Sequence, residues 1–224
     1  MRIVTWNCNL NFKVKFDAIL PLKPDVLVIQ ECERLSKNYF PNTEYTWVGR
    51  NEKKGLGVLL FDGAGSISPV YNEQLIEFLP INTDLGQFLA VWAFNHRAKK
   101  YGEDVRGHIL HALEEYELFL SDIRTVGVFG DFNNSVVWDK PKSRLSFRTT
   151  IEKFETFGLY SAYHKQNAEQ FGKETQATLF HTKNPAKPYH VDYMFTRQSV
   201  SVEVGAYDDW IEFSDHMPLT VNLK

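Results

Sequence analysis

Short apolar runs, separated by polar and glycine-bearing turns, dominate the pattern of the chain. Such runs are typical of buried strands, whereas apolar residues recurring about every three or four positions indicate helices. The pattern predicts helices at residues 12–20, 104–120 and 146–157. It predicts strands at residues 2–7, 26–29, 45–48, 57–61, 73–79, 88–94, 126–129, 176–180, 189–196, 200–204 and 217–223.

The order of these elements indicates an α/β fold. The strand at 2–7, the helix at 12–20 and the strand at 26–29 form a βαβ unit, in which the two strands are parallel. The runs at 45–48 and 57–61, joined by a polar loop with glycine, have the pattern of a hairpin.

The carboxyl-terminal part is expected to be antiparallel. The strands at 189–196 and 200–204 are separated by a short polar segment, so we expect them to pair with each other. Strands greatly outnumber helices, and no linker or repeat interrupts the chain. We therefore expect one domain over residues 1–224, with two stacked sheets and helices outside them.

Composition and charge narrow the function classes. The chain has 224 residues, of which 43% are hydrophobic, so it can bury a large core. A net charge of -3 excludes a globally basic nucleic-acid binder, although local basic patches remain possible. The longest apolar run, at 88–94, is too short to span a bilayer. Two cysteines make no disulfide framework, and no secretory leader is visible. We expect a cytoplasmic monomer that does not associate with membranes.

Polar side chains recur where the predicted strands end. Asp131 and Asn133 follow the run at 126–129 and, two apart in extended backbone, point to the same side. Taken alone, this short segment is more simply a turn that caps the strand. Comparable groups end or flank five other strands, namely Asn7, Gln30 and Glu31, His96, Asp192, and the segment 214–216.

The chemistry of these groups suits a divalent cation. The carboxylates and carboxamides are hard oxygen donors, which Mg²⁺ and Mn²⁺ prefer. Zinc is disfavoured because the chain has no cysteine cluster and no HExxH pair. Asp192 is suited to orient His216 by accepting a ring N–H. A metal, carboxylates and an Asp–His pair together suit phosphoester hydrolysis. A serine hydrolase is disfavoured because no GxSxG segment is present.

Five segments of the chain resemble one family. They are Thr5-Trp6-Asn7-Cys8-Asn9, Gln30-Glu31, Gly130-Asp131-Phe132-Asn133, His190-Val191-Asp192-Tyr193 and Ser214-Asp215-His216-Met217-Pro218-Leu219, in that order. The chain resembles the endonuclease/exonuclease/phosphatase superfamily, which includes exonuclease III, AP endonucleases, pancreatic-type deoxyribonucleases, sphingomyelinases and inositol phosphatases. The resemblance implies a four-layer sandwich, with two mixed β-sheets packed face to face, helices outside and the site at one edge.

The resemblance also implies roles for the metal and the water. Glu31 matches the principal metal ligand, Asn7 matches a residue that supports the metal or the phosphate, and Asp215 matches a residue that helps to hold the metal. Asp131 matches the residue that orients and deprotonates the attacking water. Asn133 matches the residue that positions this water or the phosphate.

Two histidines complete the implied site. Asp192 would pair with His216, which would contact the phosphate or transfer a proton. His96 resembles the opposite histidine of the deoxyribonuclease and sphingomyelinase branches. Exonuclease III and AP endonucleases have a tyrosine in this region, so the departure argues against a role at abasic sites.

Five further residues are expected to contact the substrate. Arg97 follows His96, and Lys140 lies beyond the third motif, so both are placed to meet a polyanion backbone. Trp138 beside Lys140 is suited to stack on a base. Asn9 and His190 belong to the first and fourth motifs. For His190 a structural role is the alternative.

These observations predict a phosphodiester hydrolase that depends on Mg²⁺ or Mn²⁺ and requires no other cofactor. A nuclease acting on nucleic acid is the leading interpretation. One alternative is a phosphatase or phosphodiesterase for a small molecule or a lipid headgroup. An alternative from another class is an inactive nucleic-acid-binding module.

Overall fold

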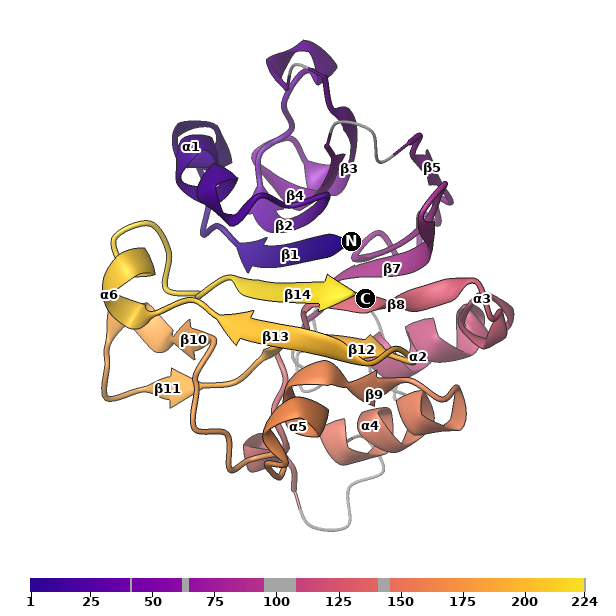
Figure 1. Cartoon of the computed structure of the whole chain (residues 1–224), viewed down its shortest axis with the longest axis vertical. Coiled ribbons are helices and arrows are strands. Elements are labelled where there is room, and N and C mark those ends of the chain that lie inside the picture. Colours follow the sequence, from indigo (N-terminus) through magenta and orange to yellow (C-terminus); the bar gives the residue numbers. More distant parts are fainter. Residues whose placement is uncertain (41, 62–64, 95–107, 141–145, 224) are drawn as a thin grey trace.

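Two six-stranded sheets form the body of the protein (Figure 1). The computed structural model describes residues 1–40, 42–61, 65–94, 108–140 and 146–223. The first sheet has the order β13 (Val200–Val204), β14 (Leu219–Leu223), β1 (Arg2–Asn7), β2 (Val26–Cys32), β4 (Lys54–Leu60), β3 (Glu44–Asn51). The second sheet has the order β5 (Ser68–Pro69), β6 (Phe78–Thr83), β7 (Gly86–Trp92), β8 (Thr125–Asp131), β12 (Asp192–Thr196), β9 (Tyr160–Ser161).

Helices lie outside the sheets and complete four layers. The first sheet carries α1 (Phe16–Ile19) and α6 (Tyr207–Trp210). The second carries α2 (His108–Glu115), α3 (Glu117–Ser121) and α4 (Phe147–Thr156), while α5 (Ala162–Asn167) contacts β12 and β13. Short pieces complete the described elements: the pair β10 (Leu179–Phe180) and β11 (Pro188–Tyr189), and 3₁₀ turns at Phe12–Val14, Leu20–Leu22, Lys37–Tyr39, Val136–Trp138 and His181–Lys183.

Three apolar clusters hold the layers together. The central cluster fills the space between the sheets with alternate side chains of both, such as Val28 and Phe129. A second cluster packs α2 and α4 on the second sheet, where the ring of Phe154 stacks on that of Phe195 at 4.2 Å. The third packs Trp6 of the first sheet against Trp210 of α6. Strands that bury both faces read as continuous apolar runs. The predicted four-layer α/β sandwich is therefore confirmed.

The predicted pairing of 189–196 with 200–204 is wrong. β12 pairs with β8 and β9 in the second sheet, whereas β13 pairs with β14 in the first. The short segment between them carries the chain from one sheet to the other. β12 is buried along its length, whereas alternate residues of β13 are exposed because it is an edge strand.

Other elements also have bounds that differ from those predicted. The strand at 176–180 begins only at Leu179, and the stretch at 189–196 is divided into β11 and β12. The strand predicted at 73–79 begins only at Phe78 and runs to Thr83. It contains Pro80, which has no N–H to donate. This proline is tolerated because β5 pairs with Ile81 and Asn82 and not with Pro80. The helix at 12–20 is split into α1 and two 3₁₀ turns. The helix at 104–120 is split at Tyr116, and residues 104–107 lie outside the described residues.

The topology gathers strand ends at one edge of the sandwich. β1 and β2 are parallel with Asn7 opposite Gln30. β7 and β8 are parallel with Trp92 opposite Asp131, and Asp131 in turn faces Asp192 of antiparallel β12. None of the helices that the structure describes is both long and apolar enough to cross a membrane.

Candidate active site

Asp131 is the last residue of β8 and is fully buried. The preceding residue, Gly130, has a φ of 151°. A Cβ at this position would overlap the carbonyl oxygen of Val91 on the neighbouring strand. Only glycine therefore allows β7 and β8 to approach each other at this point. This close approach fixes the place from which the Asp131 carboxylate projects.

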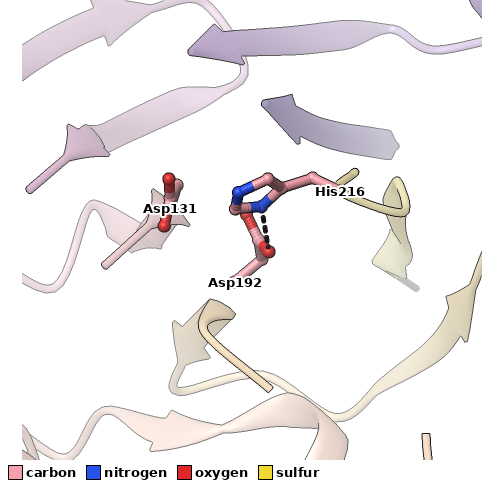
Figure 2. A group of neighbouring side chains, drawn as sticks. All are labelled: Asp131, Asp192 and His216. Atoms are coloured by element: carbon pink, nitrogen blue, oxygen red, sulfur yellow. Dashed lines mark hydrogen bonds and ion pairs between the residues drawn. The ribbon is translucent and has the colours of Figure 1, made fainter. Parts of the chain in front are cut away.

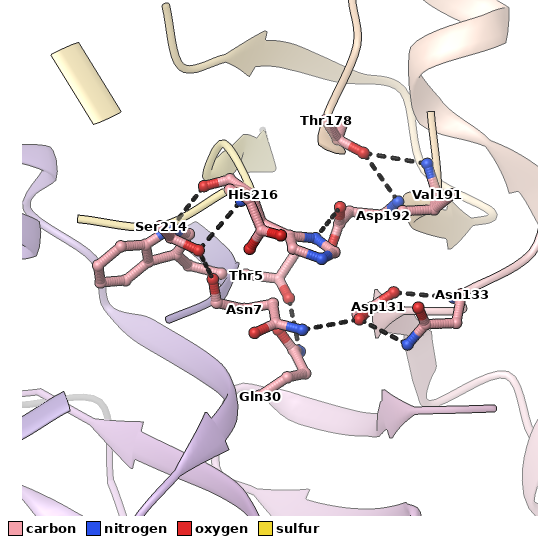
Figure 3. Close-up of polar contacts among 12 residues, drawn as sticks. Thr5, Asn7, Gln30, Asp131, Asn133, Thr178, Val191, Asp192, Ser214 and His216 are labelled. Atoms are coloured by element: carbon pink, nitrogen blue, oxygen red, sulfur yellow. Dashed lines mark hydrogen bonds and ion pairs between the residues drawn. The ribbon is translucent and has the colours of Figure 1, made fainter. Parts of the chain in front are cut away.

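Two asparagines hold the Asp131 carboxylate (Figure 3). Asn7 Nδ2 from β1 donates to Oδ2 at 2.9 Å, and Asn133 Nδ2 donates to the same atom at 2.9 Å. The backbone N–H of Asn133 donates to Oδ1 at 2.8 Å. Asn133 also donates to the carbonyl of Ala93 after β7. The carboxylate is thus fixed by residues of both sheets.

Asp192 and His216 form a buried pair next to Asp131 (Figure 2). His216 Nδ1 lies 2.9 Å from Asp192 Oδ2, and the two side chains are 7% and 1% exposed. One ligand atom from each of Asp131, Asp192 and His216 falls within a span of 4.8 Å. The predicted Asp–His pair is present in the structure, and it adjoins the predicted base.

Burial and the charges of the neighbouring groups shift the pKa values of both Asp131 and His216. Desolvation raises the pKa of Asp131, and the Asp192 carboxylate adds to the increase, while His216 opposes it. Burial alone would lower the pKa of His216, but Asp192 and Asp131 raise it to about 10. At neutral pH His216 is therefore a cation between two carboxyl groups, and Asp131 holds a proton more readily than an ordinary aspartate.

Hydroxyl groups fix the two chain segments that carry the pair. Ser214 Oγ donates to the carbonyl of Asn7 at 2.7 Å and accepts from the backbone N–H of His216 at 3.0 Å. Thr178 Oγ1 accepts from the backbone N–H groups of Val191 and Asp192, both at 3.0 Å. The alignment of the pair is therefore set by residues outside it.

Glu31 lies in a bulge of β2. Its φ is 61°, and the pairing of β2 with β4 shifts between Gln30 and Cys32. The bulge re-aims this side chain, as bulges beside functional sites commonly do. Glu31 Oε2 lies 2.9 Å from Lys54 Nζ, and Glu31 is not a member of the Asp131–Asp192–His216 cluster. A cation bound by Glu31 would replace this ammonium group.

Asp215 and Asn9 are hydrogen-bonded to each other beside Asn7. Asn9 Nδ2 donates to Asp215 Oδ1 at 3.1 Å, and the Asn9 N–H donates to Asn7 Oδ1 at 3.0 Å. Asn9, Leu10 and Asn11 all have a positive φ, so this turn is tightly wound. Lys15 Nζ holds the turn through the carbonyl groups of Cys8 and Asn9.

The donor set of this edge fits a hard divalent cation. Among the described residues, Asp192 Oδ1 and Gln30 Oε1 are buried oxygen atoms without a hydrogen-bond partner. Buried acceptors are costly to leave unpaired, and a cation or water commonly satisfies them. The atoms available to bind a metal are carboxylate and carboxamide oxygens and one imidazole nitrogen, a set that suits Mg²⁺ and Mn²⁺.

The other expected substrate contacts are less closely gathered. His190 is 3% exposed, its Nδ1 lies 2.9 Å from the carbonyl of Gln176, and its ring packs against Tyr163 and Tyr193. It is therefore packed into an aromatic cluster. Trp138 is half-buried with its ring 5.0 Å from that of Tyr189, and Lys140 is exposed. His96 and Arg97 lie outside the described residues.

Some contributors carry no local sequence signal. Thr178 is an ordinary hydroxyl residue in sequence, and only the fold reveals the backbone groups that it binds. Ser214 belongs to the fifth motif, but its bond to the Asn7 carbonyl is likewise seen only in the fold. Lys54 reads as one of several basic loop residues, although its partner is Glu31.

No family model matches the chain, and no curated protein matches it. Solved structures do resemble it. A 3′ phosphatase, NExo, from Neisseria bound to product DNA hairpin is 17% identical with a TM-score of 0.72, covering 100% of this chain and 99% of that chain. An AP endonuclease from Archaeoglobus fulgidus is 14% identical with a TM-score of 0.68, covering 100% and 99%. The endonuclease domain of TRAS1, a telomere-specific non-LTR retrotransposon, is 16% identical with a TM-score of 0.60, covering 100% and 97%. The chain therefore has the fold of these endonuclease, exonuclease and phosphatase-type enzymes, as the sequence resemblance implied.

Proposed function

We propose that this chain is a divalent-metal-dependent phosphodiester hydrolase that acts on nucleic acid. The observation that supports this most is the buried group of Asp131, Asp192 and His216 at the edge where both sheets end. A buried carboxylate with a raised pKa, beside an Asp–His pair, is suited to proton transfer. Structures with the same fold include nucleases and a phosphatase bound to product DNA.

Asp131 is the proposed base. Its Oδ2 accepts two hydrogen bonds from carboxamides and its Oδ1 accepts one from a backbone N–H, so its orientation is fixed before substrate binds. Desolvation raises its pKa, which strengthens it as a proton acceptor near neutral pH. Asp131 would take the proton of a water molecule, and Asn133 would help to hold that water.

His216 is the proposed contact to the phosphate. Its Nδ1 is engaged by Asp192, so its Nε2–H is left to face the reacting group. As a cation it would stabilise charge that develops on a phosphoryl oxygen. Asp192 would fix the orientation and charge of the ring without touching substrate.

Glu31, Asn7 and Asp215 are the proposed metal-holding residues. Bound Mg²⁺ or Mn²⁺ supplies Lewis-acid polarisation of a phosphoryl oxygen. In the structure Glu31 is neutralised by Lys54, and Asp215 accepts from Asn9. The ligand roles therefore require that Glu31 exchange an ammonium partner for the metal.

A substrate panel tests this function. We expect Mn²⁺-dependent, EDTA-sensitive hydrolysis of bis(p-nitrophenyl) phosphate, and faster hydrolysis of single- or double-stranded DNA or RNA. Binding of the favoured nucleic acid should weaken steeply with salt, because phosphate contacts release counterions. Hydrolysis confined to phosphomonoesters or lipid headgroups would contradict the nuclease assignment. Nucleic-acid binding without turnover of any phosphoester would identify an inactive binding module.

A further inference from the structure

A small cavity lies beside the candidate active site, between the β3–β4 hairpin and the ends of β6 and β7. Its volume is about 130 Å³, and Arg50, Lys54, Glu77, Trp92 and Phe94 are among its lining residues. Cavities for drug-sized ligands are larger, from about 300 Å³ upward. The space suits one ring system. We call it the Trp92 pocket.

The Trp92 pocket shares the edge of the sandwich that carries the site. Trp92 is the register partner of Asp131 on adjacent parallel strands, so both residues lie at the same level of the second sheet. β4 begins at Lys54, beside the point where β2 ends with Glu31 and Cys32. A nucleic-acid strand that passes Asp131 can therefore continue over the Trp92 pocket.

Lys54 physically joins the pocket to the site. Its Nζ lies 2.9 Å from Glu31 Oε2 and 5.2 Å from the centroid of the Trp92 ring. A cation that replaces Lys54 at Glu31 would release this ammonium group, which could then move off the indole toward a phosphate and uncover the ring. Metal binding at Glu31 and ligand binding in the Trp92 pocket would thus be linked through Lys54.

The walls of the pocket combine aromatic rings with cations. The rings of Trp92 and Phe94 lie 5.9 Å apart at 53°. Arg50 Nε lies 3.3 Å from Glu77 Oε1, and the Glu77 side chain is only 4% exposed, so a buried carboxylate anchors the guanidinium group. Aromatic faces that stack on bases, flanked by cations that meet the backbone, are the recurring elements of single-strand binding sites.

We propose that the Trp92 pocket binds an unpaired nucleobase of the substrate strand, adjacent to the nucleotide whose phosphate lies at Asp131. Trp92 stacks on the base, and Lys54 and Arg50 contact the neighbouring backbone phosphate. This inference rests on the proposed nuclease function and adds to it a preference for strands that carry bases. No base-specific hydrogen bond is invoked, so the pocket accepts different bases.

The kinetic test compares a single-stranded oligodeoxynucleotide with a base-free tetrahydrofuran phosphate strand of the same length. We expect the wild-type chain to prefer the base-bearing strand by at least about tenfold in kcat/KM, as stacking of one base commonly contributes. Trp92→Leu should lose this preference, and Trp92→Phe should retain most of it. Tyr160→Leu is the matched control, because Tyr160 is an exposed ring under Lys165 Nζ in β9 of the second sheet.

A binding measurement provides a second test that does not depend on turnover. Tryptophan emission of the wild-type chain should be quenched by dAMP and not by deoxyribose 5-phosphate, and Trp92→Phe should abolish the difference. The proposal would be overturned if wild type showed the same kcat/KM on the two strands, or if Trp92→Leu kept the wild-type preference. Equal quenching by dAMP and deoxyribose 5-phosphate would also overturn it. Bis(p-nitrophenyl) phosphate separates the two proposals. Its turnover by wild type without any base preference refutes only the pocket, whereas no turnover of any phosphoester refutes the function as well.

Discussion

His216 Nδ1 lies 2.9 Å from Asp192 Oδ2, and both side chains are buried. Because Asp192 and Asp131 together raise the pKa of His216 against the effect of burial, this nitrogen carries a proton and donates to Asp192. The contact joins a residue of β12 in the second sheet to the segment before β14 in the first. The orientation of His216 thus depends on the packing of the two sheets.

The first prediction concerns Asp192. Asp192→Asn removes the charge that holds His216 protonated, so we expect kcat on bis(p-nitrophenyl) phosphate to fall by about 100-fold or more. Asp17→Asn alters an exposed aspartate of α1 and should leave kcat unchanged. Equal activity of the two variants would show that the pair does not act in catalysis.

The second prediction concerns the pH dependence of stability without metal. The pKa of His216 rises from 6.5 to about 10 on folding, so its protonation stabilises the fold fully below pH 6.5. This contribution is lost as the pH rises through about 10. We expect the difference in unfolding free energy between wild type and Asp192→Asn to shrink over this interval. Urea titrations at several pH values measure it, and a constant difference would contradict the assigned shift.

The strand positions and the polar residues that end them could be predicted from sequence because both signals are local. Apolar runs mark strands, and Gly130 with Asp131 marks where one stops. The sheet that each of the later strands joins could not be predicted. β12 and β13 have equally strand-like sequences, and only the packing of the layers sends them to different sheets.

The site shows the same division between local and tertiary signals. The motifs identified Asp131, Asn7, Asn133 and the Asp192–His216 pair, which the structure brings into contact. The Lys54–Glu31 ion pair and the hydroxyl of Thr178 depend on long-range contacts that no spacing in the sequence reveals.

The third prediction concerns Gly130. A methyl group here overlaps the Val91 carbonyl, and the φ of 151° is unfavourable for any L residue. We expect Gly130→Ala to lower the unfolding free energy by more than about 3 kcal/mol. Gly158→Ala is the control, because its φ is also positive at 71° but its nearest neighbour is Arg197 Nε at 3.9 Å. Urea unfolding of both variants should show a clearly smaller loss for Gly158→Ala, and equal losses would contradict the steric explanation.

The fourth prediction concerns the exchange of Lys54 for metal at Glu31. Glu31→Gln should weaken Mn²⁺ binding, because it removes the charged ligand. Lys54→Met should strengthen it, because the competing ammonium is gone. Calorimetric titration with Mn²⁺ measures both effects. Glu52→Gln, which removes the exposed carboxylate paired with Arg34, should change nothing. Unchanged Mn²⁺ affinity in Glu31→Gln would remove Glu31 from the metal site.

The central claim is that Asp131 takes the proton of the attacking water, and Asp131→Asn tests it most directly. The amide retains the shape of the side chain. Its one oxygen can still accept from the Nδ2 groups of Asn7 and Asn133, whereas the NH2 that replaces Oδ1 cannot accept from the Asn133 N–H. With unchanged circular dichroism and Mn²⁺ affinity, we expect kcat on bis(p-nitrophenyl) phosphate to fall by at least about 100-fold. Near-normal turnover by this variant would contradict the account.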